Sequence, residues 1–436
     1  MADTTQGDLS APPGAPKLTG FKALELDTRL LGMVGAFVVI CLAFHVASDG
    51  RFVTPRNMFN LTIQTASVAI MATGMVFIIV TRHIDLSVGS VLATCSAVMA
   101  MMQTAWIPGA LGLDLGSPLI APLAIVAGLV AGAAIGAFHG YLVGYLAIPA
   151  FIVTLGGLLV WRNVAWYLTS GQTIGPLDEA FMLLGGIRGT MGETLSWGLG
   201  LVCVGLALWG LWAARRNKIA HEFPVKPLWA EAGVAAIIAV LILGFIALLN
   251  AYDIPDRVLA RQFDARGETM PEGLTMGYGV PYSVILVALV ALAMTVLAKR
   301  TRFGRYVFAT GGNPDAAELS GIDTRWLTVK IFALMGVLCA ISAVVASARL
   351  ANHSNDIGTL DELRVIAAVV IGGTALKGGI GTIHGAILGA LIMQSLQSGM
   401  AMVGVDAPLQ NIVVGTVLVL AVLIDIVYRK RTGARD

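Results

Sequence analysis

The sequence predicts an all-α, polytopic helical membrane protein, and three observations carry this prediction. Of the 436 residues, 57% are hydrophobic and only 12% are charged, whereas soluble domains average about 25% charged residues. Apolar runs of about 20 residues recur along the chain, and this is the length that a helix needs to cross the bilayer core. The 51 glycines suit closely packed spans, because small residues let helix backbones approach each other.

The apolar runs define about twelve candidate spans, so we expect about 10–12 transmembrane helices. These spans lie near residues 30–48, 61–80, 88–105, 118–143, 148–161, 194–213, 230–249, 282–298, 327–347, 364–376, 383–400 and 409–428. The run at 364–376 is short and glycine-rich, so a re-entrant or broken segment is an alternative to a full crossing. We expect a single transmembrane domain over residues 30–428.

Basic residues are concentrated in alternate connections, which predicts that both termini lie in the cytoplasm. The residues on that side include Lys17, Lys22, Arg29, Arg82, Arg215, Arg216, Lys218, Arg302, Arg429, Lys430 and Arg431. Residues 1–29 contain prolines and lack the apolar core of a signal peptide, so we interpret them as a disordered cytoplasmic tail. Residues 429–436 form a second cytoplasmic tail.

Two connections between the predicted spans are long. Residues 214–228 form a basic cytoplasmic loop that we expect to be solvated. Residues 251–281 form an external loop of mixed charge. Such a loop could contact an external partner, but a solvated surface loop is the commoner outcome, and both interpretations stay open.

A polar loop at about residues 299–326 carries the signals of a short helix. Asn313 is a good N-cap, and Pro314 suits the first helical position. Asp315 favours the positive N-terminal end, and Gly321 can end the helix in a left-handed conformation. A helix of about two turns is not stable alone in water, so it must pack against another surface.

The residues of this short helix do not decide what that surface is. Its apolar side consists of Ala316, Ala317, Leu319 and Ile322, most of which are small. Flanking arginines place the helix on the cytoplasmic side. One interpretation is a docking site for a partner protein, and the other is an amphipathic helix that lies on the bilayer.

The stretch from Asn57 to Gly89 starts with amides and hydroxyls, continues through an apolar span and ends in His-Ile-Asp-Leu-Ser-Val-Gly. Asp85 or Ser87 can cap the helix that we expect to follow. The functional alternative is that the polar turn at Asp85, Leu86 and Ser87 lies near a partner or a gate.

Residues 369–390 are rich in glycine. Their glycines include Gly372, Gly373, Gly378, Gly379, Gly381, Gly385 and Gly389. The stretch does not read G-x-x-x-x-G-K-[ST], which excludes a phosphate-binding loop of that type. Gly385 and Gly389 form a G-x-x-x-G pattern that favours close helix packing, and the earlier glycines permit an interrupted helix. Interrupted helices often surround transport sites, so a packing role and a path-lining or hinge role both stay open.

The side chains and motifs that the sequence lacks argue against several classes of function. The predicted spans carry almost no ionisable side chains, although ion-driven transporters use such groups to carry the coupling ion. The six histidines do not pair with cysteines or carboxylates at metal-ligand spacing, and no hydrolase motif occurs. We therefore expect a neutral polar solute, met by side chains that also suit ordinary packing. The candidates are Asn57, Gln64, Gln103, Trp161, Trp166, Gln394 and Gln397.

Three stretches resemble one known family. They read GMVFIIVTRHIDLSVGS, FGRYVFATGGNPDAAELSGI and VVIGGTALKGGIGTIHGAILGALIMQSL. In order and spacing they are similar to the membrane permease subunits of bacterial monosaccharide ATP-binding-cassette (ABC) importers, and the extra length around 214–281 looks most similar to the D-xylose branch. Arg82 and His83 depart from the two glycines that many members carry there, which puts a tight-turn role at this spot in doubt.

The resemblance implies a fold and a set of partners. Such permeases are α-helical and work as homodimers in the bacterial inner membrane. A periplasmic sugar-binding protein delivers the monosaccharide, and a cytoplasmic double-cassette ATPase binds ATP and Mg²⁺ and drives import. The resemblance therefore implies no cofactor, metal, catalytic residue or nucleic acid for this chain itself.

The resemblance also implies a coupling helix that contacts the ATPase. Its residues are Gly312, Asn313, Pro314, Asp315, Ala316, Ala317, Glu318, Leu319, Ser320, Gly321 and Ile322. The residues that we expect along a translocation path or gate are Asn57, Gln64, Asp85, Ser87, Gly372, Gly373, Gly378, Gly379 and Gln394. Two alternatives are a self-sufficient sugar facilitator or secondary transporter and a membrane anchor without transport function, which the broken spans fit poorly.

Overall fold

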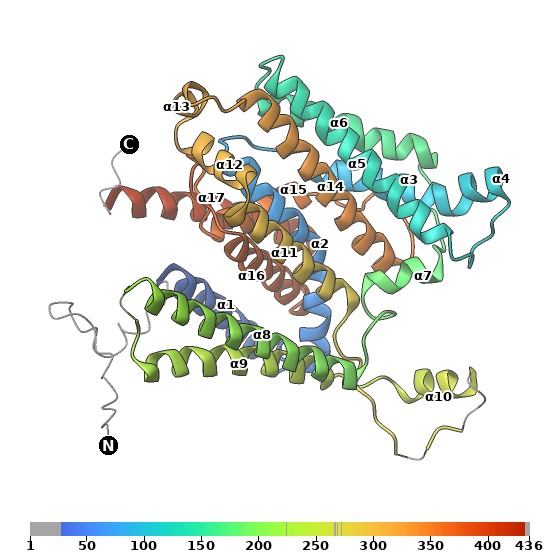
Figure 1. Cartoon of the computed structure of the whole chain (residues 1–436). Coiled ribbons are helices and arrows are strands. Elements are labelled where there is room, and N and C mark those ends of the chain that lie inside the picture. The colour runs from blue at the N-terminus through green and yellow to red at the C-terminus, as the bar shows by residue number, and fades with distance from the viewer. Residues whose placement is uncertain (1–27, 224, 266, 268, 272, 432–436) are drawn as a thin grey trace, which may run out of the picture. The chain divides into compact units, whose positions relative to one another are not determined.

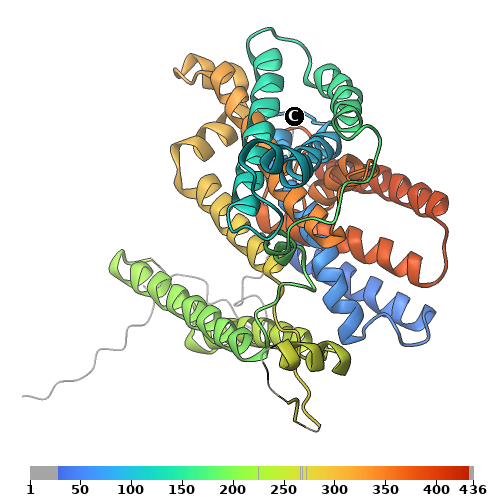
Figure 2. The same cartoon turned by 90° about the vertical axis from the view of Figure 1, so that its right-hand side faces the viewer.

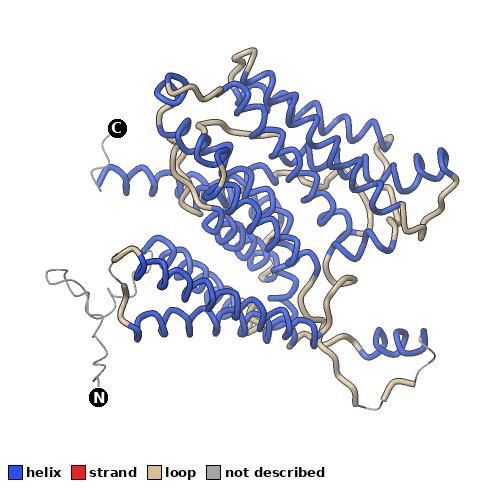
Figure 3. Tube along the Cα trace, in the orientation of Figure 1, coloured by secondary structure: helices blue, strands red, loops and turns tan. Residues whose placement is uncertain are grey.

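The computed structural model describes residues 28–431 except residues 224, 266, 268 and 272. Within these residues the protein is helical, with isolated β-bridges and no named strand (Figure 3). The all-α architecture predicted from the sequence is therefore confirmed. The described residues divide into two compact units, 28–31 with 192–279 and 32–191 with 280–431. A single domain over residues 30–428 stays a prediction.

The larger unit contains most of the helices, including all but the first four residues of α1 (Figure 1). They are α1 (Thr28–Ala47), α2 (Pro55–Val80), α3 (Val88–Met101), α4 (Ile107–Leu111), α5 (Ile120–Gly144), α6 (Ala150–Thr169), α7 (Glu179–Met182), α11 (Tyr282–Arg300), α12 (Arg302–Gly312), α13 (Pro314–Leu319), α14 (Thr324–Leu350), α15 (Asp361–Ile371), α16 (Ile383–Met402) and α17 (Ala407–Arg431). A π-helical turn, η2 (Met102–Trp106), joins α3 to α4, and a 3₁₀ turn, η3 (Leu183–Gly185), follows α7.

Ten helices in the described part of the chain are long and apolar enough to cross a membrane. This finding confirms a polytopic membrane protein. The run predicted at 364–376 differs from these spans, because α15 has only 11 residues. At 1.5 Å per residue it is about 16 Å long, against about 30 Å of hydrocarbon core. The span predicted at 364–376 is therefore the broken segment of the two alternatives. Its helix, α15, lies between two non-helical stretches, residues 351–360 and 372–382.

Helices α2 and α14 form the core of the larger unit. In an apolar 18-residue stretch of each helix, buried residues make up 89% for α2 and 78% for α14. Helix α14 also packs along α5, where a side chain at Gly132 would overlap the carbonyl oxygen of Gly336, and one at Gly136 would overlap that of Phe332. The glycine-rich composition thus has the packing role that the sequence predicted.

Two non-helical segments of the larger unit lead into α3 and α15. We call residues 81–87 the α2–α3 segment and residues 351–360 the α14–α15 segment. At the start of α3, a side chain at Gly89 would overlap the carbonyl oxygen of Gly358 in the α14–α15 segment and place its Cβ 2.6 Å from Glu362 Oε2. The helices α3 and α15 therefore begin close together, and only the lack of a side chain at Gly89 permits this approach.

The smaller unit holds α8 (Glu193–Ala220), α9 (Leu228–Asn250) and α10 (Asp256–Ala265). Helices α8 and α9 run side by side (Figures 1 and 2), and Arg215 Nη1 lies 2.6 Å from Glu231 Oε2.

Two predicted loops are partly helical in the structure. Helix α8 continues into the loop predicted at 214–228, because Arg and Lys are good helix formers that extend a helix beyond its apolar part. Helix α10 occupies part of the loop predicted at 251–281. Residues 1–27 and 432–436 of the predicted tails lie outside the described residues.

Candidate functional site

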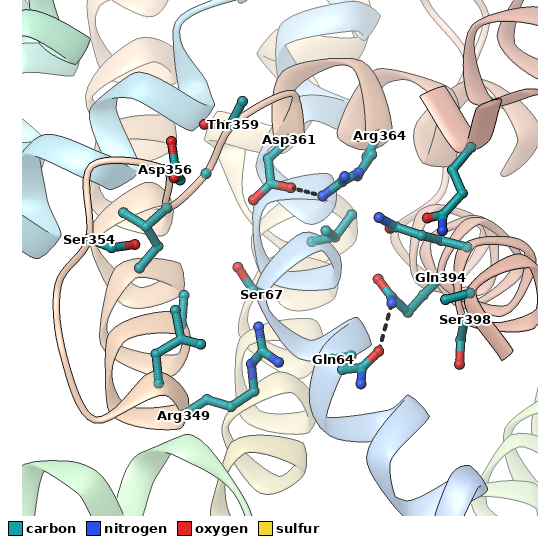
Figure 4. Close-up of a pocket in the computed structure, with 18 residues that line it drawn as sticks. Gln64, Ser67, Arg349, Ser354, Asp356, Thr359, Asp361, Arg364, Gln394 and Ser398 are labelled. Atoms are coloured by element: carbon teal, nitrogen blue, oxygen red, sulfur yellow. Dashed lines mark hydrogen bonds and ion pairs between the residues drawn. The ribbon is translucent and has the colours of Figure 1, made fainter. Parts of the chain in front are cut away.

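A polar cavity of about 470 Å³ lies in the larger unit, lined by α2, α16, the start of α17 and the α14–α15 segment (Figure 4). Helix α2 contributes Gln64 and Ser67, which are three residues apart and so share one helix face. Helix α16 contributes Gln394 and Gln397. Small-molecule sites are typically about 300–1,000 Å³ in volume, so this cavity has room for a small polar solute.

An amide pair bridges α2 and α16 at this cavity. Gln394 Nε2 donates a hydrogen bond to Gln64 Oε1 at 3.0 Å (Figure 4). One turn further along α2, Ser342 Oγ of α14 donates to the carbonyl oxygen of Ser67 at 2.9 Å. Both glutamines were predicted as path residues, and the structure brings them together at one cavity.

Charged side chains of both signs line the same cavity. Arg364 Nη1 lies 2.9 Å from Asp361 Oδ1 in the first turn of α15. Arg349 extends from the end of α14 into the cavity, and Asp356 comes from the α14–α15 segment (Figure 4). Two guanidinium groups and two carboxylates supply many donors and acceptors with little net charge. Such a wall can donate and accept many hydrogen bonds to a polar solute.

Reasoning from the sequence missed these four charged residues as candidates, because they fall at the borders of the apolar runs 327–347 and 364–376 or in the polar interval between them. Charged side chains at the ends of apolar runs normally face water. Here the α14–α15 segment folds into the interior of the larger unit, so the same charges line a cavity. The signal that could have found them is the long polar interval between these two runs.

Arg162 of α6 holds the α14–α15 segment in place. Its Nη1 donates to the carbonyl oxygens of Asn355 at 3.1 Å and Ile357 at 2.6 Å. His353 lies in the same segment, with its Nδ1 2.9 Å from Ser96 Oγ. Burial, assisted by the charge of Arg162, lowers the pKa of His353 to about 4. His353 is therefore neutral near pH 7 and adds no charge to this segment.

Several predicted candidates lie outside the cavity. Asn57 Nδ2 donates to the carbonyl oxygen of Phe52 at 2.7 Å, which stabilises the start of α2. Gln103 Oε1 accepts a hydrogen bond from the Asp178 N–H at 2.9 Å. The four glycines predicted as path residues lie in the stretch that follows α15. They are Gly372, Gly373, Gly378 and Gly379.

Asp85 and Ser87 belong to a buried network away from the cavity. Asp85 Oδ1 accepts hydrogen bonds from the Ser87 N–H at 2.8 Å and from the Ser87 hydroxyl at 2.6 Å. Ser87 Oγ lies 3.4 Å from His139 Nδ1, and Trp161 Nε1 donates to His139 Nε2 at 2.8 Å. Ser87 occupies the N-cap position of α3 without a side-chain capping bond. The network fastens the α2–α3 segment to α5 and α6.

The short helix predicted in the polar loop is present as α13. Asn313 Oδ1 accepts a hydrogen bond from the Ala316 N–H at 3.0 Å, and Gly321 has a φ of 86°. The prediction of a single apolar side is wrong, because Ala317 is only 5% exposed while Leu319 is 91% exposed. The preceding helix, α12, was not predicted. Leu319 is thus open to contact with another surface.

The described part of the chain is thus a bundle of apolar helices with a polar cavity. Over residues 57–181 and 178–422 the chain matches the family described as branched-chain amino acid transport system / permease component. The chain therefore belongs to this family of transport permeases.

The chain is also similar to individual permeases along almost its whole length. It is 36% identical to the xylose transport system permease protein of Haemophilus influenzae, over 94% of this chain and 100% of that protein. It is 36% identical to the xylose transport system permease protein of Escherichia coli, over 97% of each chain. It is 31% identical to the ribose import permease protein of Escherichia coli, over 89% of this chain and 91% of that protein. No solved structure matches the chain.

Proposed function

We propose that this chain is the transmembrane subunit of an ATP-driven importer that moves a monosaccharide, D-xylose or another pentose, into the cytoplasm. The observation that carries this proposal is the polar cavity of about 470 Å³, because its amides, hydroxyls and charges of both signs suit a neutral sugar. Similarity to two xylose permeases at 36% identity over nearly the whole chain supports the same class of solute.

The family description leaves amino acids as a second class of solute. A zwitterionic amino acid needs a cation for its carboxylate and an anion for its ammonium group. Arg364 and Asp361 already neutralise each other at 2.9 Å, but Arg349 and Asp356 also line the cavity and meet this requirement, so the charges do not separate the two classes of solute. The cavity also holds four glutamine amides, which suit the hydroxyl groups of a sugar. These amides belong to Gln64, Gln394, Gln397 and Gln410.

ATP hydrolysis requires a separate protein, because the sequence holds no G-x-x-x-x-G-K-[ST] motif. We propose that a cytoplasmic ATPase with two nucleotide-binding cassettes holds the ATP and Mg²⁺ and docks on the coupling helix, residues 312–322. The exposure of Leu319 supports this assignment, since a large apolar side chain that is 91% exposed gains free energy when a partner covers it.

The remaining partners follow from the same proposal. A periplasmic binding protein delivers the sugar, and two copies of this chain pair in the bacterial inner membrane. The concentration of Lys and Arg in alternate connections supports an orientation with both termini in the cytoplasm.

The test is uptake into proteoliposomes that contain this chain and its ATPase, with ATP and Mg²⁺ inside and the binding protein outside. Labelled D-xylose, D-ribose and leucine are compared under identical conditions. We expect a pentose to accumulate, with D-xylose entering fastest. Accumulation of leucine without any accumulation of a pentose would contradict the proposal.

A further inference from the structure

Arg82 joins the end of α2 to the helix that precedes α13. Its Nε donates to the carbonyl oxygen of Gly311 at 3.0 Å, and its Nη2 donates to that of Gly312 at 2.7 Å. Both carbonyls belong to the last turn of α12, where helix carbonyls lack a partner within the helix. A cation at this end also interacts favourably with the helix dipole. Arg82 therefore caps α12 from a distant part of the chain.

Glycines bring three parts of the chain into backbone contact at this junction. The Gly379 N–H donates to the carbonyl oxygen of Val80 at 2.9 Å. A side chain at Gly311 would overlap that same oxygen, and a Cβ at Gly378 would lie 2.6 Å from Cγ of Arg82. The end of α2, the end of α12 and the stretch after α15 must therefore accommodate each other's movements.

A series of contacts leads from Arg82 to the cavity. Arg82 has a φ of 65° and lies in the α2–α3 segment, so the tight turn that the sequence put in doubt is present. Beyond the other end of this segment, Gly89 lies against Gly358 and Glu362. Gly358 is part of the cavity wall. The α2–α3 segment and the first turn of α3 thus connect the end of α12 with the α14–α15 segment.

We propose that Arg82 is a positioning residue that transmits movement of α12 and α13 to the wall of the cavity. The inference rests on the proposed function, in which a partner ATPase moves α13. Arginine suits this role because its planar guanidinium group donates to two adjacent carbonyls at once, which a lysine ammonium group does not do in a fixed geometry. A shift of α12 that keeps both hydrogen bonds displaces residue 82 and the segment that follows it.

The test uses the complete assembly of this chain, ATPase and binding protein in proteoliposomes. The variants are Arg82→Ala, Arg82→Lys and, as a matched control, Arg56→Ala, which changes an exposed arginine at the opposite end of α2. Three quantities are measured for each variant: the amount of ATPase retained, the rate of ATP hydrolysis and the number of sugar molecules imported per ATP.

We expect Arg82→Ala to retain the ATPase and its hydrolysis while importing about fivefold less sugar per ATP, because two hydrogen bonds to one charged group are lost. Arg82→Lys should fall between Arg82→Ala and the parent protein, and Arg56→Ala should match the parent. An unchanged ratio in Arg82→Ala overturns the inference, and so does loss of the bound ATPase, which would make Arg82 a docking residue.

Two further results distinguish a failure of the inference about Arg82 from a failure of the proposed function. If Arg82→Ala fails to insert, the sugar-to-ATP ratio of Arg82→Lys decides the question, because that variant keeps the positive charge. A lowered ratio supports the inference, and a ratio equal to that of the parent overturns it. Sugar entry by the parent protein without ATP or ATPase would instead overturn the proposed function.

Discussion

Gln64 and Gln394 join two helices at the cavity through one amide–amide hydrogen bond of 3.0 Å. Loss of one partner leaves the other amide part-buried and unpaired, which costs about 1–3 kcal/mol. We expect Gln394→Leu to lower ATP-driven sugar uptake about tenfold, equivalent to about 1.4 kcal/mol, while the ATPase remains bound. Initial rates of uptake over a range of sugar concentrations measure this effect.

The neighbouring residue on α16 provides the control for this variant. Ser395 is buried, and its hydroxyl donates to the carbonyl oxygen of Leu391 at 2.7 Å within the same helix. Ser395→Ala should therefore leave uptake near that of the parent protein. Equal uptake by Gln394→Leu and Ser395→Ala would remove Gln394 from the translocation path.

At the level of single residues, the sequence predicted the candidate site only in part. Gln64 and Gln394 were found because amides inside apolar runs are unusual. Asp85 and Ser87 were found because they follow an apolar span and can cap the next helix, yet they satisfy each other within a buried network. Polar side chains that pack and polar side chains that line a path have the same pattern in a sequence. Only the three-dimensional arrangement separates the two groups.

The packing of α15 against α16 depends on glycine. A side chain at Gly389 would overlap the carbonyl oxygen of Ala368. We expect Gly389→Ala to lower the free energy of unfolding by about 1–3 kcal/mol, because the two helices must separate to admit a methyl group. Thermal unfolding of the purified protein in detergent measures the change.

Gly415 in α17 is the matched control, since no atom outside the helix backbone lies within 4 Å of a Cβ at that position. Gly415→Ala should leave stability unchanged or raise it slightly, because alanine restricts the unfolded chain more than glycine does. If both variants unfold at the same temperature, α15 and α16 do not pack through Gly389.

Helix α13 is the element on which we expect the partner ATPase to dock. Leu319→Asp replaces a side chain that is 91% exposed with a charge. We expect at least about tenfold weaker binding of the ATPase, because burying an apolar side chain of this size contributes about 1.5–3 kcal/mol. Copurification and titration of the ATPase measure it. Leu319→Met is the conservative control, and full binding by Leu319→Asp would place the docking surface elsewhere.

At the level of elements, the sequence predicted those helices whose ends are set by residues close by in the chain. The N-cap Asn313 and the left-handed Gly321 define α13 as predicted. The broken crossing around α15 was an open alternative, because glycines permit an interruption without requiring it. The entry of the α14–α15 segment into the larger unit could not be predicted, since it depends on distant contacts such as those of Arg162.

At the scale of the whole molecule, the polytopic helical architecture and the family membership were both accessible from the sequence. Apolar runs and three long motifs carry those two conclusions, and neither depends on detailed side-chain positions. The proposed role as a subunit without its own ATPase activity rests on the lack of a G-x-x-x-x-G-K-[ST] motif in the sequence.

The most direct measurement is the entry of labelled D-xylose into proteoliposomes that contain the purified chain alone, compared with vesicles that also carry the ATPase, the binding protein and MgATP. We predict no entry above empty vesicles for the chain alone, and accumulation above the external concentration for the complete system. Entry of D-xylose through the chain alone would identify a self-sufficient facilitator and contradict this account.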